Sequence, residues 1–142
     1  MALNRPSHPM QPYPSAVSQI EAMEDLETGW NGHRASRISK GSQQSAIQFL
    51  WRVWEEFRNA VPEPTIVAPT SDGGVALEWI VKYGTEERGI EIVCLPANRY
   101  EYSVRNRVTG QLEEDQEGIL DLGMIMRNVI KPHVAHQFVR AK

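Results

Sequence analysis

The stretch APTSDGGVALEW, residues 68–79, determines how the second half of the chain is interpreted. A polar Asp-Gly-Gly segment at residues 72–74 separates two apolar runs. The second run, VALEWIVK at residues 75–82, alternates with the period of a strand: Val75, Leu77, Trp79 and Val81 lie on one face, and Ala76, Glu78, Ile80 and Lys82 on the other. Asp-Gly between two such runs is a strong signal for a tight hairpin turn. We therefore predict a β-hairpin, and positive φ angles at its tip explain both glycines.

A phosphate-binding glycine loop is the alternative reading of the same segment. That loop follows a strand, ends in Gly-Lys-Ser or Gly-Lys-Thr, and opens a helix. Here no lysine follows Gly74, and a strand pattern follows in place of a helix. The segment is therefore interpreted as a turn.

Strand patterns continue on both sides of this hairpin. The segment TIVAPT, residues 65–70, is short, and its Pro69 places it at a sheet edge. RGIEIVCL at 88–95 and RYEYSVRNRV at 99–108 follow across short polar turns, which predicts an antiparallel meander. The acidic segment TGQLEEDQEG, residues 109–118, is interpreted as a loop or a further hairpin turn.

Helical periodicity appears before and after these strands. The clearest helix spans residues 42–60 and carries a broad apolar face with i, i+3, i+4 spacing. Shorter helices are predicted at residues 16–27 and 122–130. The fold class expected is α+β, with an antiparallel sheet of about four strands packed by helices on one face.

The length of 142 residues suits one domain, which we place at residues 15–132. Four prolines within residues 1–14 predict a flexible arm, and residues 133–142 are treated as a tail. The single cysteine, Cys94, excludes an intramolecular disulfide, so stability must come from the core. No apolar run reaches the length of a signal peptide or a membrane span, which predicts a cytoplasmic protein.

The formal net charge of −3 argues against a dominant nucleic-acid or membrane-surface role. A local basic patch is still compatible with that charge, and a nucleic-acid-binding module is one alternative function. It would use Arg34, Arg37, Lys40, Arg99, Arg105 and Arg107.

Three carboxylates, Glu78, Glu91 and Glu101, fall on neighbouring predicted strands at equivalent points of the alternation. A small metal-dependent hydrolase or nuclease could use them, and this is the second alternative function. Basic residues on the same predicted face also allow plain cross-strand ion pairs. We favour the ion pairs.

Metal and nucleophile motifs are weak in this chain. His133 and His136 have a spacing that could serve a metal on a helix, but a site needs a third ligand. No histidine accompanies Cys94 in a nucleophile motif, and no Gly-x-Ser-x-Gly elbow occurs. We predict no metal, no cofactor and no catalytic residue, and hence a protein that is not an enzyme.

The segments LETGWNGHRASRISKGSQQSAIQFLWRV and PEPTIVAPTSDGGVALEW resemble a family of small uncharacterised bacterial proteins. The shared pattern is a Gly-Trp-Asp/Asn-Gly loop, an amphipathic helix, a Pro-x-Pro break and a Pro-Thr-x-Asp-Gly-Gly hairpin ending in Leu-Glu-Trp. It covers about residues 26–80, and this chain departs from it in GHRASRIS and in its proline-rich arm. Proteins of this kind look like those of mobile elements, prophages and toxin or defence loci.

This resemblance implies a non-enzymatic interaction protein: an antitoxin, inhibitor or accessory subunit in toxin–antitoxin, antiviral defence or mobile-element systems. Its partner would be another protein, encoded nearby, and a homodimer through a sheet edge is a further possibility. Aromatic side chains at the margins of the long helix, next to a basic loop, predict an apolar patch with a cationic rim for an acidic partner. The predicted partner-binding residues are Trp51, Phe49, Arg34, Arg37 and Lys40.

Overall fold

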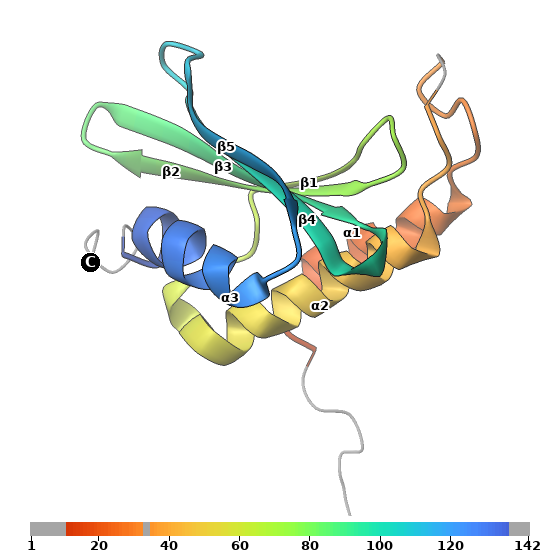
Figure 1. Cartoon of the computed structure of the whole chain (residues 1–142), viewed down its shortest axis with the longest axis horizontal. Helices are drawn as coiled ribbons and strands as arrows, with labels where there is room; N and C mark the ends of the chain where they lie inside the picture. The colour runs from red at the N-terminus through yellow and green to blue at the C-terminus, as the bar shows by residue number, and fades with distance from the viewer. Residues whose placement is uncertain (1–10, 33–34, 137–142) are drawn as a thin grey trace, which may run out of the picture.

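The computed structural model describes residues 11–32 and 35–136. It is an α+β fold in which helices cover one face of a five-stranded antiparallel sheet (Figure 1). The strands follow one another in the sheet in chain order, so the predicted fold class and meander are confirmed, with one strand more than expected. The strands are β1 (Ile66–Pro69), β2 (Val75–Tyr83), β3 (Glu86–Leu95), β4 (Arg99–Asn106) and β5 (Leu112–Ile119).

The additional strand, β5, is the segment that the sequence indicated as an acidic loop. It pairs with β4 through an antiparallel register that is interrupted by two shifts. The sequence pattern missed it because its side chains are mostly charged and exposed, so no apolar alternation marks it.

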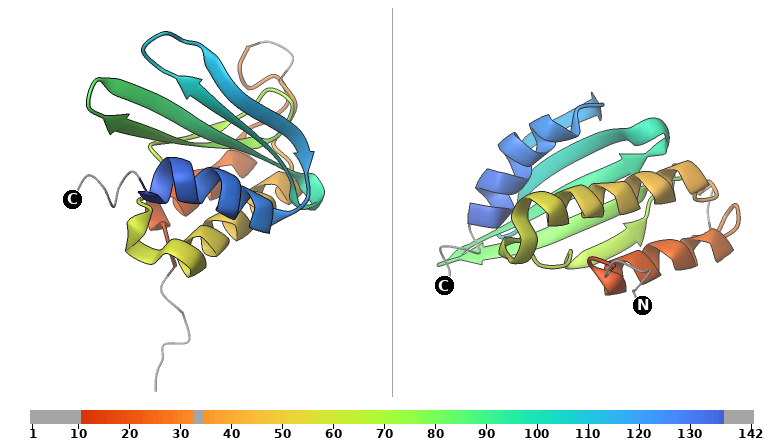
Figure 2. Two further views of the ribbon diagram at one scale, coloured as in Figure 1. Left: turned by 60° about the vertical axis from the view of Figure 1, so that its left-hand side comes forward. Right: turned by 90° about the horizontal axis from the view of Figure 1, so that it is seen from below.

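The helices lie side by side across the same face of the sheet (Figure 2). Ser39 caps the long helix by accepting a hydrogen bond from the Ser42 amide, and Asp121 caps the last helix in the same way through the Met124 amide. The last helix continues past Pro132 as a π-helical segment. The helices are α1 (Pro14–Ala22), α2 (Lys40–Phe57), α3 (Leu122–Ile125) and η4 (Met126–Ala135), with short 3₁₀ turns η1 (Met23–Asp25), η2 (Arg58–Ala60) and η3 (Pro96–Asn98).

The core forms where α2 crosses β2, β3 and β4. Trp79 is fully buried, its indole N–H donates to the Pro62 carbonyl at 2.9 Å, and its ring centre lies 6.4 Å from that of Phe49. Phe49 also packs against Tyr100, with ring centres 5.6 Å apart. The prediction that Phe49 lies at a surface margin is therefore wrong. The helix contacts α1 and η4 as well as the sheet, so its buried arc is wider than one sheet face requires.

The N-terminal boundary of the domain also differs from the prediction. Tyr13 is buried, its hydroxyl donates to the Val61 carbonyl at 2.8 Å, and its ring meets Trp54 edge-on at 5.9 Å. Pro14 then begins α1. The last two positions of the expected arm thus belong to the fold, and residues 1–10 lie outside the described residues.

The C-terminal boundary shifts in the same way, because His133 belongs to η4 and not to a tail. The last residue of η4, Ala135, is buried in the core. Residues 137–142 of the expected tail lie outside the described residues.

The segment just before α2, residues 35–39, is held against the β1–β2 turn. The Ser36 amide donates to the Ser71 carbonyl at 2.7 Å, and the Ser39 amide donates to the Gly73 carbonyl at 3.2 Å. The segment that follows the Gly-Trp loop therefore contacts the Asp-Gly-Gly turn, although the whole of α2 separates them in the chain.

The two glycines of that turn serve different purposes. Gly73 has φ +92°, and a Cβ there would lie 3.0 Å from the Arg37 carbonyl oxygen. Gly74 does not have a positive φ, so the expected conformational reason does not apply to it. A Cβ on Gly74 would lie 2.9 Å from the Thr70 hydroxyl oxygen and 3.2 Å from the Cys94 carbonyl oxygen, so close packing requires glycine there.

Candidate functional site

The face of the sheet opposite the helices is the first candidate surface, and we call it the open face (Figure 2). The structure brings the three predicted carboxylates together on it. Glu78 lies directly opposite Glu91, which in turn pairs with Ser103. Glu101 pairs with Val93 and so stands diagonal to Glu91. The strand alternation alone was sufficient to place these groups on one face.

Cations on the open face form the ion pairs that the sequence indicated, although with other partners. Arg107 donates to Glu87 at 2.9 Å and lies 3.8 Å from Glu78. Lys82 lies 3.7 Å from Glu87. Arg105 donates to the Gly110 carbonyl at 2.7 Å. Ion pairs thus account for Glu87, which also accepts a hydrogen bond from Arg107, and more weakly for Glu78.

The carboxylates nearer β5 are less well compensated. The pKa of Glu91 is raised by partial burial and then by the charge of Glu78, with Arg105 opposing the shift. The pKa of Glu101 is raised by partial burial and then by Glu117 and Asp72. Because Glu117 comes from β5, this strand extends the negative region of the open face, which the sequence interpretation did not foresee.

Glu91→Gln should stabilise the protein at neutral pH. The folded state holds the Glu91 proton more tightly than the unfolded chain, so stability falls as the pH rises from the ordinary pKa through the raised one. Removing a like charge opposite Glu78 should raise the free energy of unfolding by less than about 1 kcal/mol at about pH 7, with little change at about pH 3. Thermal melts at both pH values measure this, with exposed Glu55→Gln as the control. A lower melting temperature at neutral pH would contradict it.

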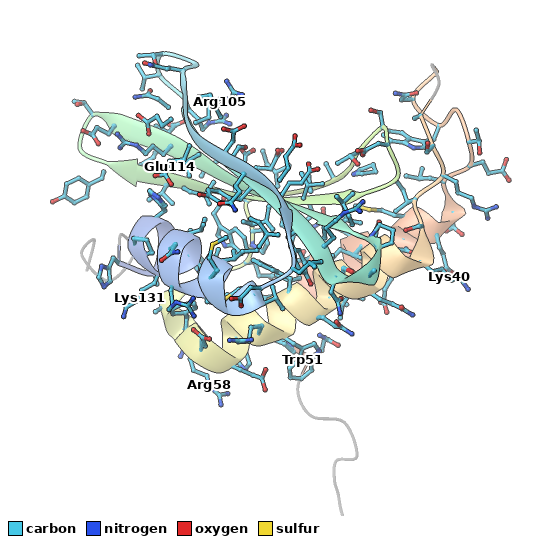
Figure 3. The ribbon with its side chains drawn as sticks, in the orientation of Figure 1. Lys40, Trp51, Arg58, Arg105, Glu114 and Lys131 are labelled. Atoms are coloured by element: carbon cyan, nitrogen blue, oxygen red, sulfur yellow. The ribbon has the colours of Figure 1, made fainter. Side chains whose placement is uncertain are left out.

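The structure places the residues of the predicted partner surface on α2 at different depths. Trp51 is half-buried and points away from the sheet, and Lys40 lies at the start of the same helix (Figure 3). Trp51 and Lys40 are eleven positions apart on the helix, a separation of about 16 Å, so a single protein interface of ordinary size can contact both. Arg37 is exposed, Arg34 lies outside the described residues, and Phe49 is excluded by its burial.

Arg105 and Lys40, two of the basic residues of the nucleic-acid alternative, lie far apart on the molecule (Figure 3). Arg105 lies on the sheet side of the molecule, whereas Lys40 lies at the far end of α2 (Figure 3). Arg107 is already paired with Glu87 and Glu78. A continuous phosphate-binding track would need these cations to be neighbours.

A cavity of about 520 Å³ opens on the helix side of the sheet, between the β2–β3 hairpin, β5 and η4; we call it the hairpin cavity. Arg88 projects into it from β3 and donates to Glu113 at 2.7 Å and to Glu86. His133 of η4 lies 2.9 Å from Glu114 at the neighbouring position of β5. The lining residues are Val81, Tyr83, Glu86, Arg88, Glu113, Pro132 and His133.

A bulge in β5 builds the charged wall of this cavity. Val104 pairs with Glu114, but the next residue, Arg105, pairs with Leu112, so Glu113 is an extra residue in the strand. Bulges re-aim side chains, and here two successive carboxylates reach toward β3 and η4. Sequence reasoning missed the cavity because it depends on a strand that was read as a loop.

Comparisons with protein-family models, with curated proteins and with solved structures gave no match for this chain. Within residues 11–32 and 35–136, no three His, Cys, Asp or Glu side chains are placed to share a metal ion. No helix in the described part of the chain has the length and apolar character needed to cross a membrane. The function therefore has to be inferred from the surfaces themselves.

Proposed function

We propose that this protein is a non-enzymatic interaction module: an antitoxin, inhibitor or accessory subunit of a bacterial conflict, defence or mobile-element system. The observation that carries the proposal is the one-sided sheet with an exposed edge. Helices cover one face only, and every residue of β5 except Ile119 is exposed. An exposed edge strand is a common docking point for a partner chain. The resemblance of residues 26–80 to proteins of such loci supports the biological setting.

The charge of β5 indicates what kind of partner fits. Four of its eight residues are acidic, and the strand carries register shifts. Two copies of this edge would repel each other, which disfavours a homodimer through β5. The other edge, β1, is short and ends at Pro69, which has no N–H to donate. A different protein with a basic surface fits β5 better than a second copy does.

The test is affinity purification from the native host with matched baits. The wild-type chain should retain a protein that the pair Asp115→Lys with Glu117→Lys loses. The control pair, Glu21→Lys with Asp25→Lys, makes the same charge change at exposed positions near α1 and should retain it. If no protein is retained by the wild-type and control baits and lost by the Asp115→Lys with Glu117→Lys bait, the proposed function is wrong.

Trp51→Ala tests the second surface. Because Trp51 is half-buried and faces away from the sheet, it should weaken partner binding by about 2 kcal/mol or more with little change in melting temperature. Trp54→Ala is the comparison, since Trp54 packs between Tyr13 and Arg58 and its loss should cost roughly 2 kcal/mol of stability. If both variants lower stability alike and binding follows the folded fraction, Trp51 belongs to the core and not to an interface.

A further inference from the structure

We infer that the hairpin cavity receives a lysine or arginine side chain of the partner protein. This inference rests on the proposed function, because it names how that partner is held. Three features of the cavity support it: its charge balance, its apolar walls and its position beside the acidic edge strand β5.

The charged wall carries an excess of acid. Glu86, Glu113 and Glu114 face Arg88 and His133, so the group is negative whether or not the imidazole is protonated. Arg88 lowers the pKa of Glu113 through their hydrogen bond, so this carboxylate stays ionised at neutral pH. A carboxylate has about four acceptor sites, and Arg88 occupies only part of them. Acceptor sites for a second cation are therefore present.

An anionic ligand fits this wall poorly. The Arg88 guanidinium already uses its Nε and both terminal nitrogens on Glu113 and Glu86. Two of its five N–H groups remain, but a carboxylate or phosphate bound there would lie beside Glu113 and Glu86 and be repelled by their like charge. A wholly apolar ligand would bury the charged groups without replacing the hydrogen bonds that water makes to them.

The other walls match the body of a long cationic side chain. Val81 and Pro132 offer apolar surface for an aliphatic stem. Tyr83 is 52% exposed and lines the same cavity, where its ring can lie against an ammonium or guanidinium group. This combination of apolar walls, an aromatic ring and surplus carboxylates is specific to lysine and arginine among the natural side chains.

The position of the cavity favours a side chain of a protein over a free amine. Glu113 belongs both to the cavity lining and to the exposed edge strand β5. Asp115 and Glu117 of the same strand face the open side of the sheet, so a segment pairing with β5 meets acidic groups there and on the cavity side. One basic segment can therefore contact the edge strand and anchor a side chain in the cavity.

The test is an NMR titration of the isotope-labelled full chain with blocked single residues. N-acetyl-lysine methylamide and N-acetyl-arginine methylamide should shift the signals of Tyr83, the Arg88 Nε–H and Glu113, with a roughly millimolar Kd that weakens as salt is added. The matched norleucine and glutamate derivatives should leave these signals unchanged. Shifts caused by the glutamate derivative, or by norleucine alone, would overturn the inference.

Variants distinguish binding in the hairpin cavity from binding on the acidic open face. Tyr83→Ala should weaken lysine binding about three- to fivefold, and Glu86→Gln about threefold. Leu120→Ala and Glu55→Gln change exposed residues outside the cavity lining and should not weaken it. Shifts centred on Glu91 instead would place the cation on the open face and overturn the inference.

Two further results distinguish the inference from the function on which it rests. If the captured partner binds Tyr83→Ala and Glu86→Gln as tightly as the wild type, the cavity is not its anchor and the inference fails while the interaction function stands. If n-butylammonium binds as tightly as a basic tetrapeptide, the cavity takes a free amine and the assignment to a partner side chain is overturned. If the basic derivatives bind the cavity but no partner is captured, the chemistry of the site holds and the interaction function fails.

Discussion

Trp79→Ala should lower the free energy of unfolding by about 3–5 kcal/mol, the largest loss expected of any single truncation in this chain. Trp79 has no exposed surface, and it stands where α2 crosses the centre of the sheet beside Phe49. Truncation would leave a large apolar cavity that packed neighbours fill only in part. It would also leave the Pro62 carbonyl without the donor that lies 2.9 Å away. The free energy of unfolding of a domain of this size is about 5–15 kcal/mol, so the expected loss is a large fraction of it.

Chemical denaturation of three variants separates the contributions to this loss. Trp79→Phe keeps most of the ring and removes the indole N–H, and it should cost about 1–3 kcal/mol. Trp51→Ala removes the same number of atoms from a half-buried site and should cost much less. A Trp79→Ala protein with the same stability as the Trp51→Ala protein would mean that Trp79 is not the centre of the core.

The elements with strong periodicity could be predicted from the sequence, and those without it could not. The alternation around Trp79 and the helical spacing in α2 each identify one buried face, and the structure confirms both. Phe49 was misplaced because the width of a helix's buried arc depends on how many neighbours cover it, and α1 and η4 are set by tertiary packing. β5 was missed because its stability comes from backbone pairing with β4 and not from side-chain burial.

The same reasoning explains which site features were foreseen. Glu78, Glu91 and Glu101 were predicted on one face because alternation along neighbouring strands fixes the face, and the structure adds that Glu78 lies directly opposite Glu91. The hairpin cavity could not be foreseen, since it requires the bulge at Glu113 and a helix that continues past Pro132 to bring His133 beside β5. A proline ordinarily predicts a helix end, and here the chain continues in a π-helical form.

Gly73→Ala is the second substitution with a large expected effect, about 2–4 kcal/mol of lost stability. Two independent causes add at this position. A side chain at φ +92° is strained wherever it stands, and the new Cβ would lie 3.0 Å from the Arg37 carbonyl oxygen. Relief of that contact requires the segment of residues 35–39 to move off the turn. Such a movement would break the hydrogen bond from the Ser39 amide to the Gly73 carbonyl.

Gly84→Ala is the matched control, because Gly84 has φ +63° in the β2–β3 turn and nothing within 4 Å of its added Cβ. It therefore reports backbone strain alone and should cost about 1 kcal/mol. Hydrogen exchange then locates the remaining effect: the Ser36 and Ser39 amides should lose protection in Gly73→Ala and keep it in Gly84→Ala. Equal losses of stability with both amides still protected would mean that the loop is not held by the turn. The pairing of the two motifs in the sequence would then need an explanation outside their contact.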